Sequence, residues 1–310
     1  MLSRLLFLKA WFVAFITPLC YLILCGFVAA LMAYPLYWAS GGEIELRALM
    51  SRGSLILLAL GLIPISKYLH LNRIELGIER FGPVLRRQAL IGFAAGVFML
   101  ALHSLLLIAL EIRVIDWNAL HNPSRLLTSF FKALGIGVVV AIIEEILFRG
   151  VLWSILQRIA GWRAAILLSS FYYSALHFYR SDLKLNPESI HWSSGFEIMG
   201  NAASHLLAME PDSFLALFLA GAFLACCRLL FPLGLGYCVG LHAGWVFVIK
   251  YSKTLTNGTP HGSWSFLVSS YDGMIGYLAA AWMGTLALLL LVIFQRSKPS
   301  RPTNAVESGS

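Results

Sequence analysis

The chain has 310 residues, of which 59% are hydrophobic and only 12% are charged. Several apolar runs are longer than a water-soluble core requires, which excludes a soluble globular protein and predicts a polytopic membrane protein. The formal charge of +8 comes from Lys and Arg residues that are scattered through short connections rather than gathered on one face. Topology and anionic lipid headgroups explain this charge better than nucleic acid, so the expected partner is the lipid bilayer and no nucleic acid.

Eight apolar spans predict an all-α transmembrane helical bundle. They cover about residues 11–36, 54–69, 89–110, 130–158, 163–178, 213–231, 234–250 and 274–294. The first span has no ionisable side chain between Trp11 and Trp38, and it is too long for a cleavable signal peptide. We therefore expect this span to be retained in the membrane.

Two connections between the spans are unusually long. Residues 70–88 mix arginines with apolar residues, which predicts a segment at the headgroup level of the bilayer. Residues 179–212 carry Trp192, Phe196, Met199, Ala203 and Leu206 at helical spacing. This pattern predicts an interfacial or re-entrant helix that caps a cavity.

The order of these features divides the chain into four parts. Residues 1–125 hold three spans and the interfacial segment, residues 126–250 form a central core, residues 251–297 hold the last span, and the polar tail 298–310 is predicted to be disordered. With the N-terminus inside, the cytoplasmic connections collect more Lys and Arg than the opposite ones, so both termini are expected in the cytoplasm. Chain size and the absence of sorting signals favour the inner membrane of a bacterium.

Charged side chains at membrane depth cost about 2.5–3.5 kcal/mol each, so their positions are informative. Most ionisable groups within the spans lie in three of them. Residues 130–158 contain Lys132, Glu144, Glu145 and Arg149, the next span ends at His177, and residues 234–250 contain His242. The remaining histidines are interpreted as structural or loop residues: His70, His103, His121, His191, His205 and His261.

Helix geometry separates the two adjacent glutamates. Glu145 and Arg149 are four residues apart on one face, so they are expected to form an ion pair that offsets much of the cost of burial. Glu144 points about 100° away from that face and cannot share the pairing as easily. An unpaired carboxylate within a membrane favours a functional role for Glu144.

Distances along the chain predict which groups meet. Glu145 lies sixteen residues before Gly161 and His177 sixteen residues after it, so an antiparallel hairpin would place them at equal depth. His242 lies only eight residues after the turn at Gly234. If the two turns are level, His242 would be roughly 12 Å shallower, and only staggered turns would remove that gap.

These residues resemble the motifs of the CPBP family, which contains CAAX proteases and bacteriocin-processing enzymes. Glu144, Glu145 and Arg149 match the EExxxR motif, and Tyr173 and His177 match FxxxH with a tyrosine in the aromatic position. His242 matches the start of HxxxN, but Val246 stands where that motif has asparagine. The resemblance covers about residues 130–250.

The resemblance implies a CAAX-protease-like bundle with an internal cavity and an intramembrane glutamate endopeptidase. It makes Glu144 the general base that activates water with the help of His177, and it gives Glu145 and Arg149 a role in holding the site together. His242 would face the oxyanion. The implied substrate is a peptide or membrane protein, and no organic cofactor is expected.

Alternatives to this interpretation remain at the level of sequence. The family also carries a metal-dependent interpretation in which zinc would bind Glu144, His177 and His242. Val246 raises the alternative of a catalytically impaired family member that acts as a membrane binding or immunity protein, with Trp245 or Tyr237 as conceivable substitutes for the missing donor. The buried charges are also compatible with a transporter that uses them as an ion relay.

Overall fold

The computed structural model describes residues 2–259 and 262–297, with only the backbone for residues 2–4. The tail that was predicted to be disordered, residues 298–310, lies outside the described residues. The protein is an all-α membrane bundle with one small sheet, as the apolar spans predict.

Ten α-helices are described along the chain. The α-helices are α1 (Leu2–Ala39), α2 (Leu46–Tyr68), α3 (Pro83–Ala109), α4 (Trp117–Leu120), α5 (Pro123–Glu145), α6 (Trp153–Phe178), α7 (Ser194–Leu207), α8 (Pro211–Leu230), α9 (Leu235–Leu255) and α10 (Tyr277–Ser297). A π-helix, η1 (Ile146–Leu152), joins α5 to α6, and the 3₁₀ turns are η2 (Pro187–Ser189) and η3 (Ser265–Leu267). Strands β1 (Arg113–Ile115) and β2 (Thr256–Gly258) pair antiparallel, with Val114 opposite Asn257.

Helices occupy all eight predicted spans. Among the described residues, six helical stretches are long and apolar enough to cross a membrane, and one of them is the continuous stretch Pro123–Phe178. Gly161 breaks that stretch with φ 81° and ψ 177°, so it contains two of the predicted spans. Helix α9 occupies the predicted span 234–250 but is not one of the six, and it is largely buried inside the bundle.

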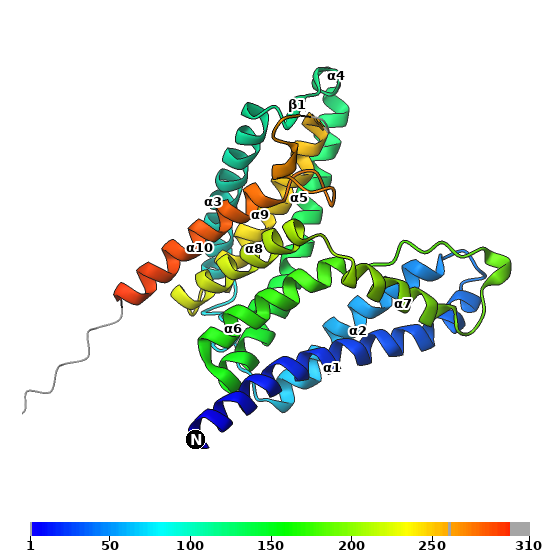
Figure 1. Cartoon of the computed structure of the whole chain (residues 1–310), viewed down its shortest axis with the longest axis vertical. Coiled ribbons are helices and arrows are strands. Elements are labelled where there is room, and N and C mark those ends of the chain that lie inside the picture. The colour runs from blue at the N-terminus through cyan, green and yellow to red at the C-terminus, as the bar shows by residue number, and fades with distance from the viewer. Residues whose placement is uncertain (1, 260–261, 298–310) are drawn as a thin grey trace, which may run out of the picture.

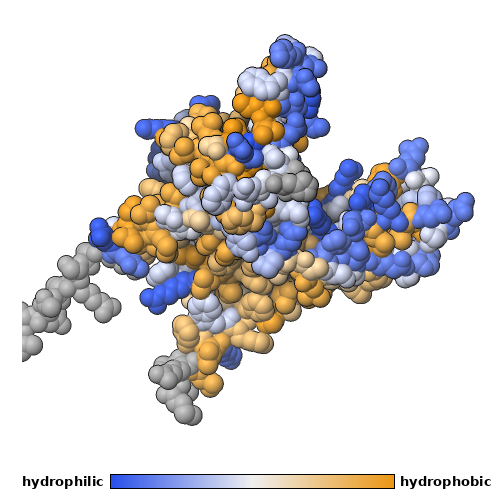
Figure 2. Space-filling model, turned by 45° about the horizontal axis from the view of Figure 1, so that its top comes forward, coloured by the Kyte–Doolittle hydropathy of each residue, from blue (hydrophilic) through white to orange (hydrophobic). Residues whose placement is uncertain are grey.

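The helices form two groups that diverge from a shared base (Figure 1). Helices α3, α5 and α9 run together towards the end that carries β1 and α4, whereas α1, α2 and α7 extend in a different direction. Helix α6 packs against α8 and also against α1, so it joins the two groups. The space-filling view shows broad hydrophobic surfaces along the helices and hydrophilic surface at the far ends of both groups, as a membrane-spanning bundle requires (Figure 2).

The sequence "GLHAG" in α9 explains how this helix is oriented. A Cβ atom at Gly240 would lie 2.1 Å from the carbonyl oxygen of Ala89, and one at Gly244 would lie 2.7 Å from that of Phe93. These small residues let α9 approach α3 closely, in the small-xxx-small manner of membrane helices. His242 lies midway between the two glycines and therefore points away from α3, towards α5.

The long connection after α6 contains the predicted helix, but a different stripe of it is buried. The buried residues of α7 are Ser194, Gly195, Ile198 and Ala202, whereas Trp192 is 54% exposed and Ala203 is exposed. Small residues permit close packing of the buried face: a Cβ atom at Gly195 would lie 2.3 Å from the carbonyl oxygen of Ala30 in α1.

Residues 69–82, which connect α2 to α3, pack against the turn between α8 and α9. Ile78 forms an isolated bridge with Gly234, and the amide of Leu235 donates to the carbonyl oxygen of Gly77. The segment that was predicted to lie at the headgroup level thus forms backbone hydrogen bonds with the turn between α8 and α9.

Candidate active site

The EExxxR segment lies where α5 changes into the π-helix. Helix α5 begins at Pro123, where the side chain of Asn122 caps it by accepting from the amide of Arg125 at 3.0 Å, and it ends at Glu145. The seven residues of η1 follow, and they include Arg149. Single-turn π-helices within α-helices occur frequently at functional sites.

Glu145 and Arg149 form the expected ion pair. Arg149 Nη1 donates to Glu145 Oε1 at 3.2 Å, and both side chains are fully buried. Arg149 Nη2 donates to the carbonyl oxygen of Gly221 in α8 at 3.0 Å. The pair therefore ties the end of α5 to α8, and this prediction is confirmed.

His242 reaches the same carboxylate, contrary to the prediction from level turns. Its Nδ1 lies 2.8 Å from Glu145 Oε1, and the side chain is 3% exposed. Residues 77–78 pair with the turn at Gly234, and α9 packs along α3 and α5. Because His242 contacts Glu145, the difference in depth of roughly 12 Å that level turns would give is absent.

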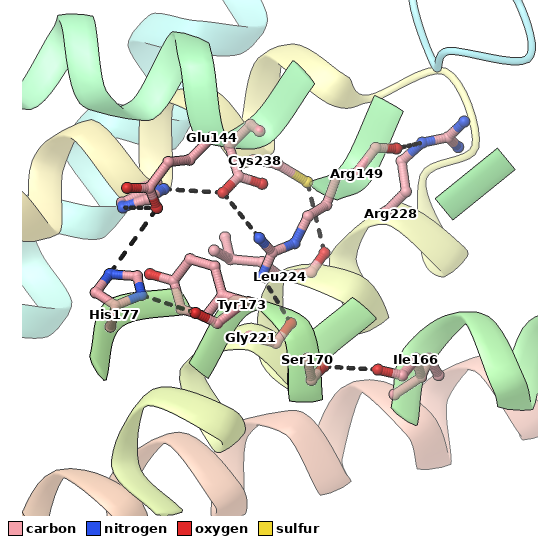
Figure 3. A network of polar contacts seen from close by, with 12 residues as sticks. Glu144, Arg149, Ile166, Ser170, Tyr173, His177, Gly221, Leu224, Arg228 and Cys238 are labelled. Atoms are coloured by element: carbon pink, nitrogen blue, oxygen red, sulfur yellow. Dashed lines mark hydrogen bonds and ion pairs between the residues drawn. The ribbon is translucent and has the colours of Figure 1, made fainter. Parts of the chain in front are cut away.

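Glu144 lies between the two histidines. Its Oε2 atom is 4.0 Å from His177 Nε2 and 3.9 Å from His242 Nε2 (Figure 3). This oxygen is buried and has no hydrogen-bond partner among the described residues, but the side chain as a whole is 25% exposed. Glu144 is thus separate from the ion pair, and its side chain is partly exposed whereas that of Glu145 is fully buried.

Hydrogen bonds determine how the two imidazoles are oriented. His177 Nδ1 lies 2.8 Å from the carbonyl oxygen of Tyr173, and because a carbonyl can only accept, this nitrogen carries the proton. Glu145 Oε1 belongs to a carboxylate that is paired with Arg149 and can only accept. His242 Nδ1 therefore carries the proton and donates to this oxygen. In the neutral form of each ring, Nε2 is then an acceptor directed towards Glu144.

A cavity of about 580 Å³ opens beside Glu144 and His177. Leu147, Phe148 and Leu176 continue its wall on the α5 to α6 side. The opposite wall comes from α2 and α7 and contains both apolar residues and arginines. These lining residues include Arg47, Arg52, Leu55, Leu58, Ile198 and Met199. The sequence did not predict the contribution of α2, because nothing in its pattern distinguishes a cavity wall from a lipid-facing surface.

Tyr173 is more central than its place in the motif suggested. Its ring lies 4.6 Å from the guanidinium carbon of Arg149 and 4.7 Å from the His177 ring, and it meets the His242 ring edge-on at 5.9 Å. The residue is 3% exposed. The tyrosine therefore contacts both histidines and one partner of the ion pair, with a cation–π contact to Arg149.

Arg228 in α8 forms a hydrogen bond with the backbone of the π-helix, and the sequence did not predict this role. Arg228 Nε donates to the carbonyl oxygen of Arg149 at 3.2 Å, and Nη2 donates to that of Glu75 at 2.8 Å. Ser154 Oγ donates to the carbonyl oxygens of Gly150 and Glu75, each at 2.7 Å. The Glu75 carboxylate in turn pairs with Arg158, which lowers the pKa of Glu75 below its ordinary value.

The distances at Glu144 do not fit a zinc site. A carboxylate and two imidazoles are suitable ligand types, but tetrahedral zinc with bonds of about 2.0–2.1 Å holds its ligand atoms about 3.3 Å apart. The observed separations from Glu144 Oε2 are 3.9 and 4.0 Å. Among the residues that the structure describes, no group of three His, Cys, Asp or Glu side chains is placed to hold a metal ion. Zinc binding would require the three side chains to move closer together.

The fold and this constellation define a class of protein. A helical bundle of membrane-spanning segments encloses a carboxylate, two imidazoles and a buried Glu–Arg pair beside a cavity. This is the arrangement of an integral membrane protein with a candidate active site.

The comparison with known families gives the particular family. Residues 126–248 match the family described as Rce1-like, type II CAAX prenyl endopeptidase, so this segment is similar to CAAX proteases. The matched segment contains Glu144, Glu145, Arg149, His177 and His242. No curated protein and no solved structure matches the chain.

Proposed function

We propose that the protein is an intramembrane endopeptidase that hydrolyses a peptide bond in a membrane-associated peptide or protein. The observation that carries this proposal is the position of Glu144. Its carboxylate is free of the Glu145–Arg149 pair, lies within 4.0 Å of two imidazole nitrogens and borders the cavity. The family match supports protease chemistry of the CAAX type.

In the proposed reaction, Glu144 is the general base. A water molecule in the cavity would lie against Glu144 and His177, whose side chains are 25% and 24% exposed. As the water oxygen attacks the carbonyl carbon, its proton passes to the Glu144 carboxylate. The C–N bond then breaks, and the proton passes to the departing amine nitrogen. The products are a new carboxyl terminus and a new amino terminus.

The remaining residues position this base. His177 presents the unprotonated Nε2 to the water because Nδ1 donates to Tyr173. Glu145, held by Arg149, orients His242 through Nδ1. His242 Nε2 is directed at the Glu144 carboxylate, with Glu144 Oε2 3.9 Å away. We therefore assign positioning roles to Glu145, Arg149 and His242.

The parts of the chain have different roles in this proposal. We assign residues 126–250 to the catalytic core and residues 1–125 to the substrate-facing wall, because α2 lines the cavity opposite Glu144. Residues 251–297 complete the bundle, with α10 packed against α8. The distribution of Lys and Arg supports an orientation with both termini in the cytoplasm of a bacterium, and reporter fusions at each terminus would test it.

The central experiment is the Glu144→Gln variant of the full-length protein in lipid nanodiscs. Membrane-peptide libraries are incubated with the protein in H₂¹⁸O, and mass spectrometry detects new C-termini that carry one ¹⁸O atom. We expect the wild-type protein to cleave and Glu144→Gln to lose at least about 1000-fold in rate, because the general base is removed. Thermal unfolding should be unchanged.

A matched control is Glu188→Gln, which makes the same chemical change at an exposed position in η2. This variant should cleave at the wild-type rate. Normal cleavage by Glu144→Gln would show that Glu144 is not the base. Zinc dependence is tested separately by measuring the metal content of the active protein and its rate after treatment with a chelator.

A further inference from the structure

The proposed reaction needs a hydrogen-bond donor as well as a base. When water attacks the carbonyl carbon, negative charge develops on the carbonyl oxygen, and a single well-placed donor to that oxygen typically accounts for about 100- to 1000-fold in rate. Glu144 can only accept when ionised. In their neutral forms, His177 and His242 also present acceptors towards Glu144, because each Nδ1–H is already used. The site therefore holds many acceptors and few donors.

Two donors close to the glutamates and His242, Arg149 and Trp245, are committed or enclosed. Arg149 uses Nη1 for Glu145 and Nη2 for Gly221, and its Nε is buried without a partner among the described residues. Trp245 Nε1 is likewise buried, and its ring packs on Phe223 in α8 at 5.6 Å. Neither group can reach a substrate in the cavity without rearrangement.

Val246 supplies no donor either. It lies four residues after His242 in α9 and therefore on the same face of the helix. Its side chain has no atom that can form a hydrogen bond. Val246 therefore cannot donate a hydrogen bond to the developing oxyanion.

Resting on the proposed function, we infer that Tyr173 is a further catalytic residue, whose hydroxyl donates a hydrogen bond to the developing oxyanion. Figure 3 shows the Tyr173 hydroxyl oxygen beside the His177 ring and on the side of Glu144, with no dashed line to any residue drawn. The ring is held in place by Arg149 at 4.6 Å, His177 at 4.7 Å and Phe148 at 5.3 Å. This immobile phenol is already oriented before the substrate arrives.

The role of Tyr173 involves no transfer of its proton. The π electrons of the carbonyl move onto oxygen as the water oxygen bonds to carbon, and the Tyr173 O–H donates to that oxygen. The proton of the water passes to Glu144 and then to the amine nitrogen as the C–N bond breaks. The carbonyl re-forms, and the tyrosine is unchanged at the end of the cycle.

The test uses Tyr173→Phe, which removes one oxygen atom and keeps the ring. Measured with a peptide that the wild-type protein cleaves, kcat should fall about 100- to 1000-fold, while KM changes less than about twofold and thermal unfolding is unchanged. The second variant, Tyr173→Phe/Val246→Asn, places an amide donor one turn after His242. This double variant should recover at least about tenfold of the lost kcat.

Controls separate this inference from the proposed function. Trp245→Phe should cleave within about threefold of the wild-type rate, because that indole is enclosed. If the wild-type protein cleaves, Glu144→Gln does not, and Tyr173→Phe keeps kcat within about threefold, the inference is overturned while the proposed function stands. Absence of cleavage by the wild-type protein would overturn both.

Discussion

The two sides of the cavity are built differently. On the side of α5, η1 and α6, Phe148 and Tyr173 belong to the largest apolar cluster among the described residues, and Glu145 and Arg149 are fully buried. On the opposite side, α1, α2 and α7 pack around a smaller apolar cluster of six buried residues. Helix α2 buries only Leu46 and Met50 among its described residues.

This difference suggests that one side holds the site residues in place and the other side contacts the substrate. Tight packing and the Glu145–Arg149 ion pair hold Glu144 and the histidines in one geometry, as the proposed general base requires. The thinly packed wall can yield at lower cost, and it is the wall that a bound peptide would contact. We therefore expect changes on the first side to affect stability and kcat, and changes on the second side to affect mainly KM.

The largest expected effect is that of Glu145→Gln. This change leaves Arg149 charged and buried without a carboxylate and weakens the bond that orients His242. Breaking a buried ion pair typically costs about 3–5 kcal/mol, so both the free energy of unfolding and cleavage should fall. Tryptophan fluorescence during thermal unfolding measures the first, and peptide cleavage the second.

The neighbouring residue provides the contrast for this prediction. Glu144→Gln should remove cleavage and leave unfolding unchanged, although it alters the adjacent position in the same helix. Equal losses of stability in the two variants would contradict the separation between the ion pair and the base.

A smaller effect is expected from two glycine substitutions that probe the two sides directly. A Cβ atom at Gly240 would lie 2.1 Å from the Ala89 carbonyl oxygen, and one at Gly195 would lie 2.3 Å from that of Ala30. Gly240→Val should destabilise the protein by about 1–3 kcal/mol and lower kcat, because it displaces α9 and His242. Gly195→Val should displace α7 and raise KM, with a smaller loss of stability.

Kinetic and unfolding measurements on both glycine variants check the comparison. If Gly195→Val lowered kcat as much as Gly240→Val at unchanged KM, the wall formed by α1, α2 and α7 would be part of the catalytic framework. The proposed division between the two sides would then be wrong.

The smallest effect concerns the connection that leads to α7. His205 Nε2 lies 2.8 Å from Asp182 Oδ1, and this hydrogen bond lowers the pKa of Asp182. Because the folded-state pKa is below the ordinary value, the contribution is complete above that value and is lost as pH falls through the lowered pKa. Hydrogen exchange of α7 should therefore increase only below about pH 4, and Asp182→Asn should remove this dependence.

Much of the helical pattern was predictable from sequence. Apolar length located the spans, and the four-residue spacing of Glu145 and Arg149 predicted their ion pair, which the structure confirms. Equal distances from Gly161 correctly predicted that the glutamates and His177 would meet. These features follow from the regular geometry within one helix or one hairpin.

Contacts between helices that are distant in the chain were less predictable. The sequence did not predict which face of α7 is buried, and it left open whether His242 reaches the depth of the glutamates. The roles of Arg228 behind the π-helix and of α2 in the cavity wall had no signal in the sequence. An apolar side chain is compatible with lipid and with protein alike, so hydrophobicity does not identify which helices pack together.

The sequence by itself determined where the helices form and which charges enter the membrane, because span length and helical spacing are properties of each segment alone. Only the tertiary structure decided that His242 and His177 converge on Glu144 from different helices. That convergence depends on how far α9 is shifted along α3 and α5. Glycine contacts and the pairing of Gly234 with Ile78 set this shift, and a helical repeat cannot encode it.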